Sequence, residues 1–333
     1  MKHIISQFSL VVSLLCFSLC GKAQSSHERE ESIPYGDFDK WMVRVIDESL
    51  IIGGRSKCLY EVAPADTVRG DIPYKSSSES PWRTSNVMAR VSGVTKCSVS
   101  VFPEPRDSGY CVRLETLLDS CKVFGLFNIK VLVPGTIYMG QMMEPIRDTK
   151  NPQSKLNAGV PFTKRPKAVV LDYKFTTPGT DHRIKSTGFS RQREVPGRDS
   201  CELYVILQKR WEDAEGNVYA KRVGTLVRRF YENTPEWINN YHADILYGDI
   251  TSRPEYRSYM RLIPEEESLY CVNSRGESVP IHEVGWAGPD ETPTHLVFRA
   301  SSSRGEVYVG TVGNKFYLDN IRLSYDQPTT PEP

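Results

Sequence analysis

The amino-acid sequence predicts an all-β protein with the architecture of a β-sandwich. Short runs in which apolar and polar residues alternate, many of them β-branched or aromatic, follow one another and are bounded by Gly, Pro, Asn and Asp. Long amphipathic patterns with helical spacing are scarce. Repeated short strands of this kind are typical of sandwiches and jelly rolls. The clearest strand-like runs are residues 110–116, 123–133, 167–175, 201–209, 221–230, 237–247, 295–301, 306–310 and 316–325.

Turn residues separate these runs and fix where the chain reverses. The segment Asp213-Ala214-Glu215-Gly216-Asn217 predicts a hairpin connection, and Ser303-Arg304-Gly305 predicts another. Between residues 33 and 326 we find no internal repeat and no linker long enough to separate domains. The sequence therefore predicts one sandwich domain over residues 33–326.

The alternation also assigns each side chain to one face of its strand. In residues 110–116, Val112 and Leu114 point to one side while Arg113 and Glu115 point to the other. If the strands are neighbours, the polar side chains form one charged, hydrogen-bonding face; the alternative is an ordinary solvated surface. In the other runs the polar side carries Asp172, Lys174, Glu202, Tyr204, His242, Asp244, His295 and Arg299.

The N-terminal residues predict export. Lys2 and His3 precede an apolar stretch over residues 10–19 and small residues around Ala23, which is the layout of a secretory signal spanning residues 1–23. This stretch is too short to span a bilayer, and no later stretch is long and apolar enough for a transmembrane helix. Cys20 allows the alternative of a lipoprotein, although Leu19 is larger than the residue that usually precedes such a site. We expect a secreted, periplasmic or cell-envelope protein.

The composition of the remaining chain narrows its partners. The net charge is +1 with acids and bases interspersed, which excludes the one-sided basic field of a nucleic-acid-binding protein. Residues 24–32 are polar and predict a solvated leader, and residues 327–333 predict a flexible tail. Export permits disulfides, but several cysteines lie in apolar runs where a buried free thiol is the alternative. The six that follow the signal are Cys58, Cys97, Cys111, Cys121, Cys201 and Cys271.

Several segments, taken in their order and spacing, resemble a known family. They are Gly36-Asp37-Phe38-Asp39-Lys40-Trp41, Pro81-Trp82-Arg83-Thr84-Ser85-Asn86, Arg113-Leu114-Glu115-Thr116, Arg165-Pro166-Lys167 with Asp172-Tyr173-Lys174, Pro293-Thr294-His295, Ser301-Ser302-Ser303 and Leu318-Asp319-Asn320-Ile321. This pattern resembles the putative carbohydrate metabolism domain (PCMD) family of exported Bacteroidetes proteins. The resemblance implies a jelly-roll-like sandwich similar to carbohydrate-binding modules, with long loop insertions, and a glycan as partner. It brings no established reaction and no assigned catalytic residues.

The resemblance to carbohydrate-binding modules also suggests a structural calcium ion between the first and last strands. Asp37, Asp39 and Asp319 could supply the carboxylate ligands that calcium prefers. The alternative is that these residues cap turns at the ends of strands.

Exposed tryptophans beside polar side chains are the residues that a sugar site needs, because the apolar face of a sugar ring stacks on an aromatic ring. Trp82 follows a Ser-rich stretch and Trp286 lies between glycines, so both are predicted platforms; the alternative is a loop anchored by its buried Trp. Further ligand-binding residues are expected on the polar strand faces, namely Arg113, Tyr204, His242, His295 and Arg299.

Glycoside hydrolysis requires two carboxylates about 5 to 10 Å apart. Glu115, Asp172, Glu202 and Asp244 would supply such a pair if their strands share one face. The alternative is a set of cross-strand ion pairs with neighbouring arginines and lysines. The sequence thus predicts a protein that binds or processes carbohydrate, with a glycoside hydrolase and a structural or adhesion protein without a sugar site as the alternatives.

Overall fold

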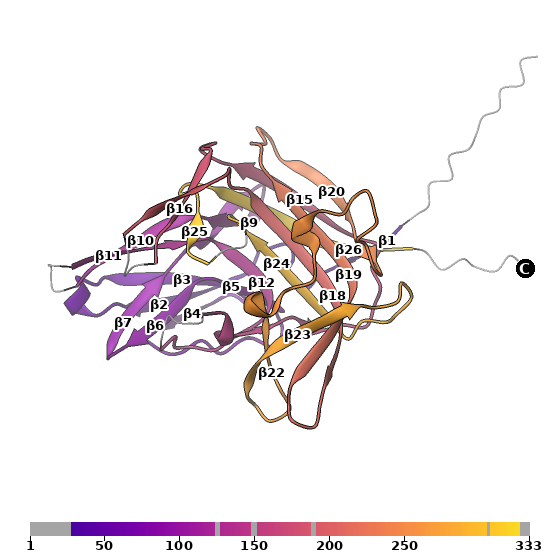
Figure 1. Ribbon diagram of the computed structural model, residues 1–333. Helices are drawn as coiled ribbons and strands as arrows, with labels where there is room; N and C mark the ends of the chain where they lie inside the picture. Colours follow the sequence, from indigo (N-terminus) through magenta and orange to yellow (C-terminus); the bar gives the residue numbers. More distant parts are fainter. Residues whose placement is uncertain (1–27, 124–126, 148–151, 188–190, 305–306, 327–333) are drawn as a thin grey trace, which may run out of the picture.

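The computed structural model describes residues 28–123, 127–147, 152–187, 191–304 and 307–326. Within these residues the protein is all-β, as predicted, and its helical segments are single 3-10 turns (Figure 1). These turns are η1 (Leu50–Ile52), η2 (Pro152–Lys155), η3 (Ser258–Met260) and η4 (Glu265–Glu267).

Two large sheets form the body of the molecule. A six-stranded sheet contains β1 (Arg29–Ser32), β8 (Val101–Arg106), β9 (Gly109–Glu115), β15 (Ala168–Thr176), β20 (Ile238–Asp244) and β26 (Lys315–Tyr325). Its strand order is β20-β15-β26-β9-β8, and β1 also pairs with β26.

The second sheet has ten strands. They are β5 (Trp82–Thr84), β12 (Thr136–Met142), β13 (Leu156–Ala158), β14 (Val160–Pro161), β18 (Cys201–Glu212), β19 (Val218–Phe230), β21 (Leu246–Tyr247), β22 (Tyr270–Val272), β23 (Ser278–Trp286) and β24 (His295–Ser301). The main path runs β13-β12-β24-β18-β19-β23-β22, and β5, β14 and β21 pair with β12, β24 and β19.

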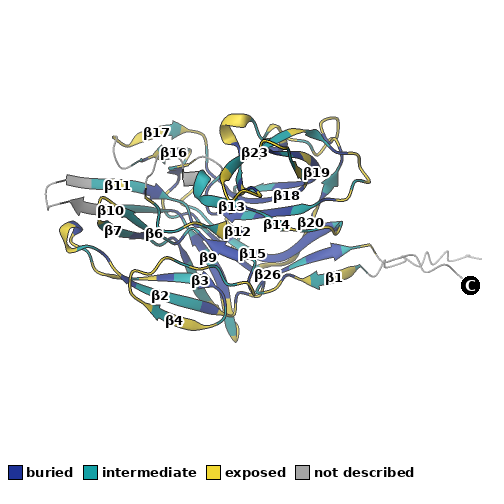
Figure 2. Cartoon of the chain, turned by 90° about the horizontal axis from the view of Figure 1, so that it is seen from below, coloured by how far each residue is buried: buried dark blue, intermediate teal, exposed yellow. Residues whose placement is uncertain are grey.

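The two sheets pack face to face through their apolar sides. Alternate residues such as Val169 and Leu171 in β15, and Leu203 and Val205 in β18, are fully buried in one common hydrophobic core. Figure 2 shows this buried layer along the central strands β15, β18 and β26. The outer faces of the sandwich consequently point in opposite directions, which decides where the polar side chains of each strand lie.

Smaller sheets extend the sandwich at one end. They comprise β2 (Trp41–Asp47) with β3 (Ser56–Val62) and β4 (Asp66–Arg69), β6 (Val87–Val91) with β7 (Val94–Ser98), β10 (Leu117–Val123) with β11 (Phe127–Val133), and β16 (His182–Lys185) with β17 (Arg193–Pro196) and β25 (Val309–Gly310). Strands β7, β10 and β11 lie at the opposite end of the molecule from β1 (Figures 1 and 2). The insertions expected as long loops therefore form strands of their own.

Three details differ from the expectation. Residues 29–32 of the predicted solvated leader form strand β1, which pairs with Arg322–Tyr325 of β26. The predicted run 237–247 is divided between the two sheets, because β20 ends at Asp244 and β21 then pairs with β19. Of the predicted run 306–310, Val309–Gly310 forms β25, and residue 306 lies outside the described residues together with the predicted signal and tail.

Most of the described cysteines are buried and all of them are free thiols. Cys97, Cys111, Cys201 and Cys271 are buried free thiols and Cys58 is an exposed one, while the side chain of Cys121 lies outside the described part. In the same described ranges, no helix has the length and apolar character that crossing a membrane requires.

Candidate functional site

The predicted polar residues lie on two opposite faces of the sandwich, so the expectation of one shared face is wrong. Glu115, Asp172 and Asp244, with Arg113 and His242, lie on strands of the six-stranded sheet. Glu202, Tyr204, His295 and Arg299 lie on strands of the ten-stranded sheet. Alternation gives the side of each strand on which a residue lies, but it does not give the sheet to which the strand belongs. The four predicted catalytic acids therefore do not converge.

The outer face of the six-stranded sheet is a network of ion pairs. Arg113 bonds to Glu115 and also to Glu104. Asp172 and Asp319 are cross-strand partners that share the guanidinium of Arg106, at 3.0 and 2.7 Å. Here the alternative of cross-strand ion pairs holds, because each acid has a cation directly beside it.

Two further predicted residues lie at the edge of that network. His242 Nε2 lies 3.0 Å from Glu28 Oε2, and its Nδ1 lies 3.4 Å from Asp244 Oδ1. His242 therefore lies between Asp244 of its own strand and Glu28, which directly precedes β1.

The three predicted calcium ligands are not brought together. Asp37 is exposed, Asp39 Oδ1 accepts a hydrogen bond from the Tyr110 amide at 2.9 Å, and Asp319 bonds to Arg106. Across the described ranges there is no group of three or more His, Cys, Asp or Glu side chains suited to a metal ion. Arg106 supplies at Asp319 the positive charge that a cation would bring, and the calcium site stays a prediction.

We expect the free energy of unfolding to depend on pH through the titration of Asp319. Burial raises the pKa of this carboxyl to about 6, although the positive charge of Arg106 acts to lower it. The folded protein thus holds the Asp319 proton more tightly than the unfolded chain, so this contribution to stability is full below pH 4 and is lost as the pH rises through about 6. The free energy of unfolding of Asp319→Asn, taken relative to that of wild type, should therefore rise by about 2 kcal/mol from pH 4 to pH 7.

Urea denaturation at several pH values measures this difference. For the neighbouring Asp172, burial raises the pKa, but hydrogen bonds from Asn240 and Asn320 and the charge of Arg106 outweigh it and leave the pKa lowered. Its contribution has the opposite sign and is lost as the pH falls, so Asp172→Asn is the matched control. Equal pH dependence in wild type and Asp319→Asn would contradict the assignment.

The prediction that Trp82 is an exposed platform for sugar is wrong. Its side chain is fully buried, its ring contacts Phe298 edge-on at 5.0 Å, and its Nε1 donates to the Pro34 carbonyl at 3.0 Å. The Ser-rich stretch before it indicated a loop, but Trp82 begins strand β5, which pairs with β12 and turns the ring into the core.

Trp286, the other predicted platform, is partly buried at the end of β23. It packs against a second hydrophobic cluster that contains Tyr204, Ile206 and Met260, and its ring lies 5.7 Å from the guanidinium carbon of Arg222. These contacts correspond to the alternative reading, in which the ring anchors its loop.

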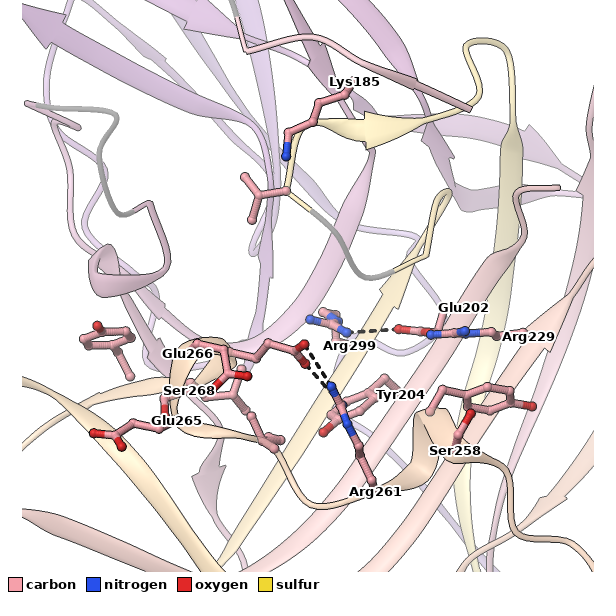
Figure 3. Close-up of a pocket in the computed structure, with 16 residues that line it drawn as sticks. Lys185, Glu202, Tyr204, Arg229, Ser258, Arg261, Glu265, Glu266, Ser268 and Arg299 are labelled. Atoms are coloured by element: carbon pink, nitrogen blue, oxygen red, sulfur yellow. Dashed lines mark hydrogen bonds and ion pairs between the residues drawn. The ribbon is translucent and has the colours of Figure 1, made fainter. Parts of the chain in front are cut away.

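The outer face of the ten-stranded sheet contains a cleft of about 720 Å³. Its floor is formed by β18, β19 and β24, whose register places Glu202 opposite Arg229 and Tyr204 opposite Arg299. Arg229 Nε donates to Glu202 Oε2 at 2.8 Å, and Arg299 Nη2 donates to Glu202 Oε1 at 3.0 Å. The floor is therefore one buried carboxylate held between two guanidinium groups (Figure 3).

Aromatic rings support both arginines of the floor. The guanidinium of Arg299 lies over the ring of Tyr204 at 4.8 Å, and that of Arg229 lies over Tyr259 at 4.2 Å. Burial raises the pKa of Tyr204 to about 12, so this phenol stays protonated at neutral pH. Tyr270 also lines the cleft, so that the cleft contains the tyrosine rings of Tyr204, Tyr259 and Tyr270 beside its charged groups.

One wall of the cleft is a long connection that we call the strap, residues 248–269 between β21 and β22. Its apolar residues Ile250 and Met260 are buried against Ile206 and Val227 of the sheet. The Ile263 amide donates to Glu283 Oε2 at 2.8 Å. The strap carries Ser258, Tyr259, Arg261 and the acidic turn η4 into the cleft, and Lys185 of β16 lines it from another side (Figure 3).

His295, a predicted ligand residue, lies on the same outer face but outside this cleft. Burial lowers its pKa to about 4, with a further contribution from Arg210, so the ring is neutral at physiological pH. Its Nδ1 lies 2.9 Å from the hydroxyl of Thr294.

Of the predicted site residues, Glu202, Tyr204 and Arg299 meet in the cleft, whereas Lys185, Arg229, Tyr259 and Arg261 were missed. A signal for Arg229 was present in the hairpin turn at residues 213–217. If the regular pairing next to that turn, in which Lys209 faces Lys221, continued along the hairpin, Arg228 would lie opposite Glu202. A bulge between Leu207 and Gln208 shifts the register by one residue, so that Arg229 lies there instead. The residues of the strap have no strand pattern that would have revealed them.

Comparison with known protein families identifies a match. The model of the family PCMD, described as "Putative carbohydrate metabolism domain", matches residues 56–234. The chain belongs to the PCMD family. The matched part of this PCMD chain includes the floor residues Glu202, Tyr204 and Arg229, while the strap and Arg299 lie beyond it.

Solved structures and curated proteins were compared with the chain as well. A solved structure described as a putative glycoside hydrolase from Bacteroides thetaiotaomicron is similar with a TM-score of 0.42 and 13% identity, over 83% of this chain and 76% of that one. No curated protein matches the chain.

Proposed function

We propose that this PCMD chain binds a glycan in the cleft between the strap and the outer face of the ten-stranded sheet. The observation that carries the proposal is the combination of tyrosine rings with paired, partly exposed charged groups in one open cleft. Membership in a carbohydrate-related family supports it. As part of this proposal the protein acts outside the cytoplasm, which the sequence of residues 1–23 predicts.

The chemistry of the cleft suits a sugar ring. The C–H face of a pyranose stacks on an aromatic ring, and its hydroxyl groups exchange hydrogen bonds with charged and amide groups. Tyr259 on the strap offers such a ring, and Ser258, Arg261 and Glu266 surround it with donors and acceptors.

Binding is a better account of the cleft than hydrolysis. A glycoside hydrolase needs one acid that gives a proton to the leaving group. Both oxygens of Glu202 instead accept hydrogen bonds from Arg229 and Arg299, and its side chain is 3% exposed, so a glycosidic oxygen in the cleft can hardly reach it. Glu202 acts in the proposal as the group that orients two arginines.

The test is a glycan array followed by calorimetric titration of the best ligand. Tyr259→Ala should weaken binding about 10- to 100-fold, because it removes the stacking ring. Tyr259→Phe keeps the ring and should bind within about threefold of wild type, a difference of about 0.7 kcal/mol.

Tyr110→Ala, which removes an exposed tyrosine of β9 on the other sheet, is the matched control and should leave binding unchanged. Equal affinity in Tyr259→Ala and wild type, with melting curves that show both folded, would exclude the cleft as the site. Hydrolysis of the bound glycan that is abolished by Glu202→Gln would favour the enzyme instead.

A further inference from the structure

We infer that the glycan taken by this cleft is acidic, carrying carboxylate or sulfate groups. The inference rests on the proposed function and adds the chemical class of the ligand. It follows from how the charges of the cleft are distributed and how far each is exposed.

The floor of the cleft has more cations than anions. Arg229 and Arg299 share the single carboxylate of Glu202, so two positive charges face one negative charge. The Glu202 side chain is 3% exposed, whereas those of Arg229 and Arg299 are 17% and 27% exposed. A ligand in the cleft can therefore reach the guanidinium groups but can hardly reach the carboxylate between them.

A third cation lines the same space. Lys185 of β16 is exposed, and Figure 3 shows its ammonium group pointing into the cleft. Lys185, Arg229 and Arg299 come from three different strands. Among the described residues of these strands and of β18 that line the cleft, the one acid is Glu202.

The other acids that line the cleft, among the described residues, belong to the strap. Glu265, Glu266 and Glu267 form the turn η4, and Glu267 bonds to Arg261 at 3.0 Å in a pair whose side chains are half exposed. Separated in this way, the two kinds of charge would orient a ligand. Its anionic group would lie toward the cationic floor, and its hydroxyl groups would donate to the carboxylates of the strap.

Arginine is well suited to the anionic half of this arrangement. Its planar guanidinium forms paired hydrogen bonds with carboxylate and with sulfate-like oxyanions, and such charge-assisted bonds are about twice as strong as neutral ones. Because Glu202 and the tyrosine rings already hold both guanidinium groups in place, little side-chain entropy would be lost when an anion binds.

The experiment compares three oligosaccharides of equal length by calorimetry: a neutral galactan, an oligogalacturonate and a sulfated galactan. At low salt we expect at least one acidic ligand to bind wild type about tenfold or more tightly than the neutral one. The ratio should shrink severalfold at 0.5 M NaCl, because the charges are partly solvated and are screened.

Two variants locate the preference in the cleft. Lys185→Gln and Arg299→Gln should each lower the affinity for the acidic ligand severalfold more than the affinity for the neutral one. Lys209→Gln, which removes a lysine bonded to Glu291 outside the cleft, should leave the preference intact.

The outcomes separate the inference from the proposed function. Equal binding of neutral and acidic ligands, or a preference that persists in both cleft variants, would overturn the inference and leave glycan binding standing. Absence of binding to every glycan on the array would overturn the proposed function itself. Lys185 is exposed and its variant should fold normally, so the test does not depend on Arg299→Gln being stable.

Discussion

Replacement of Glu283 by Ala is expected to lower the free energy of unfolding by about 3 to 5 kcal/mol. Arg222 and Glu283 form an ion pair whose side chains are both fully buried, with the shortest contact at 2.5 Å. Removal of the carboxylate would leave the guanidinium of Arg222 without a counter-charge and without water. Such an orphaned charge costs far more than the net contribution of an ion pair.

Glu283 also holds the strap against the sheet. In addition to Arg222, its carboxylate accepts hydrogen bonds from Gln208 Nε2 and from the Ile263 amide, each at 2.8 Å. The variant should therefore loosen one wall of the cleft as well as destabilise the fold. Glycan affinity should fall even at temperatures where the variant remains folded.

Chemical denaturation with two further variants tests this account. Arg222→Met/Glu283→Leu removes both charges and should recover most of the lost stability, since an apolar pair of similar volume leaves nothing unpaired. The control is Glu232→Ala, which breaks the exposed pair with Arg198 and should cost less than about 1 kcal/mol. A loss in Glu283→Ala as small as that of the control would contradict the role assigned to this pair.

Replacement of Trp82 by Ala should also cost about 3 to 5 kcal/mol, because a large side chain is removed from a closely packed core. Trp82 contacts Phe38 and Phe298 and donates to the Pro34 carbonyl, so the variant loses ring contacts and leaves that carbonyl without its donor. Its glycan affinity, measured where the variant is folded, should equal that of wild type.

Trp211 provides the matched control for this substitution. It is 43% exposed and stacks on Tyr219 across the β18–β19 hairpin, so Trp211→Ala should cost less than about 1 kcal/mol. Two outcomes would contradict the assignment of Trp82 to the core: similar melting curves for the two Trp variants, or a stable Trp82→Ala protein that binds glycan weakly. The second would favour Trp82 as a sugar platform.

The sequence was sufficient to predict several central strands of both large sheets, among them β15 and β18, and their apolar sides. Val169 and Leu203 lie in the core because alternation in a strand is a local property that neighbouring residues reveal. The hairpin turn at residues 213–217 was equally local, since Gly216 adopts the positive φ of 90° that its turn requires.

The location of the site depended on contacts distant in sequence. Asp172 and Glu202 have the same pattern around them, and only the packing of two sheets separates them onto opposite faces. Trp82 was misread because its partner strand β12 lies more than 50 residues away along the chain. The strap has no alternation at all, and its place over the sheet depends on Glu283, which itself follows it in sequence.

The central claim is that glycan binds between the strap and the floor of the cleft, and a crystal structure of the protein with its best oligosaccharide tests it most directly. We predict a sugar residue stacked on Tyr259, with oxygen atoms within hydrogen-bonding distance of Arg299. A sugar bound instead on the neighbouring rings of Trp211, Tyr219 and His282, of which Trp211 is exposed, with the cleft empty, would contradict the claim.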